Sequence, residues 1–181
     1  MLEKALNQSS VGLSSIFPEI KQYDWLHFRF EYKPMAKQSF KFSVKKVEKK
    51  SDNDKEFQVN KYTPIEQIRR QTDISWDTLQ QLKAQKPNHS PYDCPVEMKI
   101  IHAFEPPKNF GKKRIEKLKK GIKIYMDKRP DLIDNLNKIL GDAMQGIVYT
   151  NDSRIAKASL EKIYSINPYT EIWVRKLPDE F

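Results

Sequence analysis

Four charged residues recur at near-helical spacing in the segment RPDLIDNLNKILGDAMQGIVYTNDS, residues 129–153. They are Asp131, Asp134, Lys138 and Asp142. On a helix their steps of three, four and four residues place them in one lengthwise stripe. A further acid, Asp152, follows a Gly-containing break and a short β-branched run. Because hard divalent cations such as Mg²⁺ take carboxylate oxygens as ligands, the segment is a candidate metal site.

An ordinary surface helix also explains the stripe. Asp131, with Asp134 three residues later, is typical of a helix start, where the first acid caps free amides and both acids interact favourably with the helix dipole. Lys138 then pairs with Asp134 and Asp142, at about 0.3–0.5 kcal/mol for each exposed pair. Periodicity alone favours this explanation. Asp152 favours a metal, since an ion relieves a repulsion of about 4 kcal/mol between two carboxylates ~4 Å apart at an effective dielectric of 20.

The composition indicates an anionic partner. The chain has 181 residues, the size of one domain, with a net charge of +9 and a pI of about 9.4. Ten basic and two acidic residues lie between positions 108 and 129, so most of the surplus directly precedes the acidic segment. A single cysteine, Cys94, permits no intrachain disulfide, and neither a signal-peptide pattern nor a membrane-spanning apolar run is present. We expect a cytoplasmic protein without a membrane partner.

The patterning predicts an α+β fold: a single domain, residues 26–181, in which a mixed β-sheet packs against helices, preceded by an N-terminal arm, residues 1–25. The expected strands are residues 26–33, 40–47, 57–62, 96–104, 147–150, 159–166 and 170–176. The expected helices are residues 64–85, a basic helix at 112–125, and the helix that carries the acidic stripe. The apolar side of that last helix is expected to comprise Ile133, Leu136, Leu140 and Ala143.

The acidic segment, KRPDLIDNLNKILGDAMQGIVYTNDSRI, resembles the signature of the RusA-type Holliday junction resolvases. That signature runs approximately Lys-Pro-Asp-x-Asp-Asn-Leu-x-Lys, then Asp-Ala-Leu-Asn-Gly-x-x-Tyr, then Asp-Asp-Ser-Gln-Ile. The stretches KPMAKQSFKF, CPVEMKIIHAFEPPKNFGKKR and LEKIYSINPYTEIWV are similar to the family's first turn, its strand with a basic loop, and its closing strands. The resemblance covers roughly residues 26–176.

The resemblance implies a set of site residues. The expected metal ligands are Asp131, Asp134 and Asp152, and the expected catalytic residues are Lys138, Asp134 and Asp152. The expected DNA-binding residues are Lys37, Lys41, Lys112, Lys113, Arg114, Lys128, Arg129 and Asn135. Asp142 also matches a signature position.

Three departures from the family pattern accompany these matches. Two residues, Leu132 and Ile133, separate the first two acids where the family usually has one, so Asp131 either binds metal or only caps the helix. Asn151 precedes Asp152 where the family has a pair of aspartates, and Ser39-Phe40 replaces the usual Arg-Pro.

The implied function is Mg²⁺-dependent hydrolysis of phosphodiester bonds in branched DNA, with Mn²⁺ as an alternative metal, by a homodimer that resolves four-way junctions in DNA recombination and repair. One alternative is a DNA-binding protein that kept the fold and lost catalysis. Another is a nuclease of the same fold with a different DNA substrate. The three histidines lack metal-ligand spacing and are expected to be structural; they are His27, His89 and His102.

Overall fold

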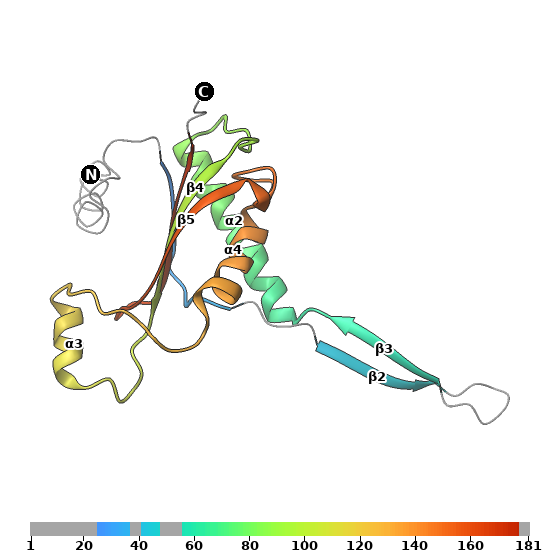
Figure 1. Cartoon of the computed structure of the whole chain (residues 1–181), viewed down its shortest axis with the longest axis horizontal. Helices are drawn as coiled ribbons and strands as arrows, with labels where there is room; N and C mark the ends of the chain where they lie inside the picture. The colour runs from blue at the N-terminus through green and yellow to red at the C-terminus, as the bar shows by residue number, and fades with distance from the viewer. Residues whose placement is uncertain (1–24, 37–40, 48–55, 178–181) are drawn as a thin grey trace.

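A four-stranded mixed sheet forms the centre of the computed structural model, which describes residues 25–36, 41–47 and 56–177 (Figure 1). The side chains of residues 46, 47, 56–58, 134 and 135 lie outside this description. The strands are β1 (Leu26–Phe30), β4 (Val96–Phe104), β5 (Ile155–Tyr164) and β6 (Tyr169–Lys176), in the order β1-β6-β4-β5. β6 runs antiparallel to β1 and β4, whereas β4 and β5 are parallel. The predicted α+β class is confirmed.

Two helices cover one face of this sheet (Figure 1). They are α2 (Ile65–Gln85) and α4 (Asn137–Met144). Phe28, Ile100 and Ile172 of the sheet are completely or nearly completely buried in the same core as Leu82 of α2 and Met144 of α4. Each such side chain contributes about 1.5–3 kcal/mol through burial. This packing fixes α4, and with it the acidic segment, against the central strands.

Strands β2 (Lys41–Val47) and β3 (Glu56–Tyr62) form a separate antiparallel pair that projects from the body (Figure 1). The charged stretch EKKSDNDKE, residues 48–56, predicts the tip of a hairpin between these two runs, and their antiparallel pairing agrees with it. Glu56 is already the first residue of β3, and residues 48–55 lie outside the described residues. The predicted arm, apart from Trp25, also lies outside them. Phe42 and Val44 are exposed on this pair.

The predicted basic helix is shorter than expected. Helix α3 spans Lys112–Lys119, and Gly121 then adopts a φ of +75° that favours glycine. The following residues run beside β5: the Met126 amide donates to the Lys162 carbonyl and the Tyr164 amide to the Ile124 carbonyl, both at 2.9 Å. The apolar residues after Gly121 therefore belong to an extended segment that leads to the acidic residues.

The strand predicted at residues 147–150 is a turn instead. The amides of Ile147 and Val148 donate to the Met144 carbonyl at 3.1 and 3.0 Å, which tightens the end of α4. Only isolated bridges connect Tyr149 with Tyr92 and Gln145. Val148 and Tyr149 are thus buried in a loop, whereas Thr150 is exposed.

The helix with the acidic stripe begins with a π-helical turn, Leu132–Leu136, which precedes α4. A π-turn closes hydrogen bonds over one more residue than an α-turn and therefore changes the phase of the side chains. Ile133, predicted on the apolar side, is 77% exposed, whereas Leu136 and Leu140 are buried as predicted.

None of the described helices is long and apolar enough to cross a membrane.

Candidate functional site

Asp131 lies at the entrance to the π-turn. Its backbone is extended, with φ −68° and ψ 136°, and its side chain is exposed. No side-chain capping hydrogen bond joins it to the described amides of the turn. The capping role suggested by the sequence is therefore not seen, and the carboxylate faces solvent.

Asp134 and Asn135 belong to the π-turn, and their side chains lie outside the described ones. The same turn contains Leu132 and Ile133, the pair that is one residue longer than in the family signature. Because a π-turn accommodates one residue more than an α-turn, the additional residue coincides with the turn that can absorb it.

Two acidic residues of the signature segment, Asp142 and Asp152, both influence the buried hydroxyl of Tyr149. Lys138 Nζ lies 3.9 Å from Asp142 Oδ1 one turn further along α4. The Tyr149 hydroxyl donates to the Gly141 carbonyl at 3.1 Å. Burial raises the pKa of Tyr149 above its ordinary value, and the negative charges of Asp152 and Asp142 raise it further. The carboxylates from α4 and from the segment after the turn therefore act on the same hydroxyl.

The loop that presents Asp152 is held from both sides. Asp152 begins a 3-10 turn, Asp152–Arg154, and the Asn151 side chain accepts a hydrogen bond from the Ser153 amide at 2.9 Å. Asp93 Oδ1 accepts from Arg154 Nη2 at 2.6 Å and from Thr150 Oγ1 at 2.9 Å. These contacts fix the backbone while Asp152 itself stays exposed.

Sequence reasoning did not select Tyr149 or Asp93. Tyr149 occupies the tyrosine position of the Gly-x-x-Tyr step in the signature, so the motif contained a signal for it. The sequence contained no signal for Asp93, because its partner Arg154 is 61 residues away in the chain.

The predicted ligands are chemically suited to a hard cation. Asp131, Asp134 and Asp152 offer only carboxylate oxygens, the donors that Mg²⁺ and Mn²⁺ prefer. Within the described side chains, which do not include that of Asp134, no three acidic, histidine or cysteine residues are grouped closely enough to hold a metal ion. The donor chemistry fits the metal, and the grouping of the three acids remains a prediction.

Each histidine has a structural partner. His27 Nε2 lies 2.9 Å from Glu171 Oε1, and His89 Nε2 lies 3.1 Å from the Val148 carbonyl. His102, which is 1% exposed, lies 3.1 Å from the Asn137 side chain. These contacts agree with the structural role expected for the histidines.

The basic residues form two separated surfaces. Lys112, Lys113 and Arg114 are exposed on α3, a helix without buried residues, and the exposed Lys128 and Arg129 lead from it to Asp131. The exposed Lys41 lies on the β2–β3 pair, on the other side of the body from α3 (Figure 1). Lys37 lies outside the described residues.

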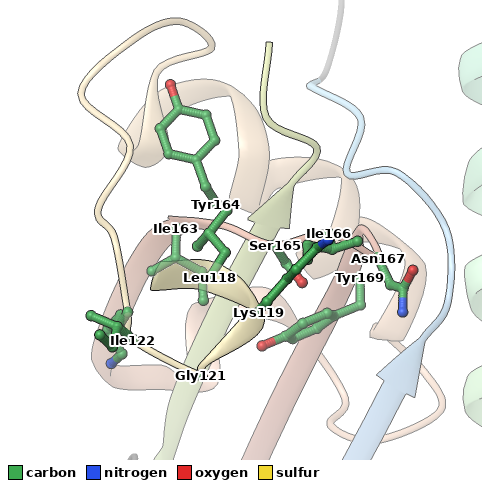
Figure 2. Close-up of a pocket in the computed structure, with 11 residues that line it drawn as sticks. Leu118, Lys119, Gly121, Ile122, Ile163, Tyr164, Ser165, Ile166, Asn167 and Tyr169 are labelled. Carbon is green, nitrogen blue, oxygen red and sulfur yellow. The ribbon is translucent and has the colours of Figure 1, made fainter. Parts of the chain in front are cut away.

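A hollow of about 420 Å³ lies between the end of α3 and the β5–β6 turn (Figure 2). Lys119, Ile122, Tyr164 and Tyr169 are among its lining residues. The described residues that line it include no carboxylate, so it is distinct from the candidate metal site. It borders the basic surface of α3.

Comparisons with known proteins identify two matches. The family model described as "Endodeoxyribonuclease RusA" matches residues 31–175. An uncharacterized protein, YqaN of Bacillus subtilis (strain 168), is 32% identical over 82 residues. That match covers 45% of this chain and 56% of YqaN, so the chain spans only about half the length of this relative.

Proposed function

Because the chain belongs to the RusA endodeoxyribonuclease family, we propose that it is a metal-dependent endonuclease that hydrolyses phosphodiester bonds in branched DNA. Four-way junctions are the proposed substrate, in DNA recombination and repair. The observation that carries the proposal is that Asp142 and Asp152, from two different elements, both raise the pKa of the Tyr149 hydroxyl, with Lys138 3.9 Å from Asp142. These residues come from the segment that carries the family signature, and that segment begins with the basic residues 128 and 129.

Asp131, Asp134 and Asp152 would hold Mg²⁺, with Mn²⁺ as the alternative. The bound metal would supply Lewis acidity toward the phosphate and lower the pKa of a water molecule. Lys138, whose side chain is 54% exposed, would place its ammonium beside the phosphate and stabilise the developing negative charge. No nucleophilic side chain is required.

The basic surface of α3 would offset the repulsion between the acidic site and the DNA backbone. Lys37, Lys41, Lys128, Arg129 and Asn135 are the further proposed DNA contacts. A four-way junction offers two equivalent strands, and a twofold homodimer would present two sites with matching symmetry. We therefore include a homodimer in the proposal.

The proposal is tested by incubating the protein with end-labelled four-way junction, flap and linear duplex DNA, with Mg²⁺, with Mn²⁺ and with a chelator. Metal-dependent cleavage of the junction is the expected result. Junction binding without cleavage would identify a DNA-binding protein of this fold. Preferential cleavage of the flap or duplex would identify a nuclease with another DNA substrate.

Reversing three charges on α3 is expected to weaken DNA binding and flatten its salt dependence. In the triple variant Lys112→Glu, Lys113→Glu, Arg114→Glu, the slope of log K against log salt should fall by about three, since each phosphate contact contributes about one. Fluorescence anisotropy with a labelled junction at several salt concentrations measures this. Lys83→Glu is the control: it reverses the charge of one exposed lysine on α2, away from α3, and should change the slope far less. An unchanged slope in the triple variant would exclude α3 from the DNA surface.

Deletion of Ile133 tests whether the π-turn absorbs the additional residue. Ile133 is 77% exposed, so its loss removes little core packing, and the deletion allows the turn to close as an α-turn. We expect a folded protein with a melting temperature within about 4 °C of the wild type, corresponding to less than ~1 kcal/mol. Junction cleavage should also persist, because the family spacing is restored. Cooperative folding with complete loss of cleavage would show that the longer spacing itself is needed.

A further inference from the structure

Three polar side chains form a row across the sheet beside the acidic segment. Thr170 of β6, His102 of β4 and Lys162 of β5 are direct register neighbours, and we call them the polar row. The polar row lies among strands whose apolar residues pack against α4, and Asn137, the first residue of α4, contacts His102. Polar groups beside a core are costly unless they are hydrogen-bonded, so their partners indicate what they do.

His102 connects the sheet to the π-turn. Asn137 Nδ2 donates to the Leu132 carbonyl at 2.5 Å, which orients the amide and leaves Asn137 Oδ1 as an acceptor 3.1 Å from His102 Nε2. His102 must therefore carry its proton on Nε2, and Nδ1 faces Thr170 Oγ1 at 3.4 Å. Burial lowers the pKa of His102 to about 4, which agrees with a neutral ring. The chain of contacts ends on the carbonyl of the first residue of the π-turn.

Lys162 holds the backbone on the other side of Asp131. Its Nζ donates to the Pro130 carbonyl at 2.7 Å and to the Lys128 carbonyl at 2.5 Å. Bonds from a charged donor are stronger than those between neutral groups. The Lys162 carbonyl also accepts from the Met126 amide, so the approach to Asp131 is fixed at several points.

These contacts bracket Asp131. The Pro130 carbonyl belongs to the peptide plane before Asp131, and the Leu132 carbonyl belongs to the plane that follows Leu132. Both planes are tied to the polar row, whereas the Asp131 side chain is exposed and makes no capping bond with the described amides. The backbone contacts on its two sides therefore fix the Cα–Cβ bond from which the Asp131 carboxylate projects.

We infer that Lys162 and His102 are positioning residues that hold the backbone around Asp131 and at the start of the π-turn so that the carboxylates are oriented for a divalent cation. The inference rests on the proposed metal site and deepens it. Neither residue contacts the metal; Lys162 acts through two carbonyls, and His102 acts through Asn137. Groups that orient metal ligands typically change metal affinity by about 10- to 100-fold when removed.

The test measures Mn²⁺ binding without DNA, by titration calorimetry and by the paramagnetic resonance signal of free Mn²⁺. Lys162→Met keeps the aliphatic stem and removes the donor, so we expect Mn²⁺ affinity to fall by about tenfold or more. Lys162→Arg retains donors and should recover most of the affinity. Asp131→Asn is the reference for loss of a ligand.

Lys157→Met is the matched control on the same strand. It breaks the 3.1 Å contact between Lys157 Nζ and Glu97 Oε1, so it should lower the melting temperature without changing Mn²⁺ affinity.

His102 is tested with two variants because it is buried. His102→Gln has an amide that can still donate to Asn137, so this variant should bind Mn²⁺ more tightly than His102→Leu. Rescue by the donor-retaining variants is a result that a merely structural role would not give.

Wild-type Mn²⁺ affinity in folded Lys162→Met would overturn the inference while leaving the metal site intact. Equal affinities in His102→Gln and His102→Leu would overturn the part assigned to His102. If the wild-type protein binds no Mn²⁺ and cleaves no DNA with any metal, the proposed function itself fails. The two failures are thus distinguishable.

Discussion

Asp152→Asn is expected to lower metal-dependent cleavage of a four-way junction by about 10³-fold and to leave junction binding intact or tighter. Two unit charges ~4 Å apart at an effective dielectric of 20 interact by about 4 kcal/mol, and each 1.36 kcal/mol corresponds to a factor of ten in rate. Asparagine has nearly the same shape, and the carboxylate it replaces would repel the DNA phosphates. Single-turnover cleavage and anisotropy measure the two effects separately.

Asp152→Asn is expected to leave the loop around residue 152 unchanged. The side chain that caps the 3-10 turn belongs to Asn151, and the loop is tied to Asp93 through Arg154 and Thr150. Asp134→Asn should have an effect of similar size. Asp127→Asn, which neutralises an exposed acid shortly before the site, is the control and should cleave at nearly the wild-type rate. Wild-type cleavage in both Asp134→Asn and Asp152→Asn would refute the metal site.

The spacing of apolar residues correctly predicted the strands and helices in which buried residues recur at the period of a regular strand or helix. The alternation of LHFRF and the run VEMKIIHAF correspond to β1 and β4, and the helix predicted at 64–85 corresponds to α2. The basic helix was predicted too long because Ile122 continues its apolar period. In the structure Gly121 ends that period, and the segment after it forms backbone hydrogen bonds with β5. The spacing of apolar residues within a segment does not reveal a hydrogen bond such as that between Ile124 and Tyr164, which are 40 residues apart.

The candidate site shows the same limit. Helical periodicity placed Ile133 on the apolar side because it assumed a uniform α-helix, and the π-turn made that assumption wrong. Asp152 lies outside the helical stripe, so its place after the short β-branched run suggested it, and the signature resemblance then implied a metal-ligand role. Lys162 and His102 could not be found from spacing, because their relation to Asp131 depends on the register of β4, β5 and β6.

Lys138→Met is expected to slow junction cleavage by about 10²-fold or more at saturating DNA while barely changing stability. Removing one preorganised group that stabilises transition-state charge typically costs about 10²–10³ in rate. The ion pair with Asp142 is 3.9 Å long and its lysine is 54% exposed, so it contributes only about 0.3–0.5 kcal/mol. The melting temperature should therefore fall by no more than about 2 °C.

Asp142→Asn separates the two explanations of the acidic stripe, because it breaks the same ion pair and leaves the Lys138 ammonium in place. If Lys138 stabilises the phosphate, Asp142→Asn should cleave within about tenfold of the wild type, well above Lys138→Met. If Lys138 only pairs with its neighbour on a surface helix, both variants should lose the same small amount of stability and neither should lose cleavage. Lys138→Arg adds a third point: it keeps the charge and changes its geometry, so cleavage between those of Lys138→Met and the wild type would indicate that both matter.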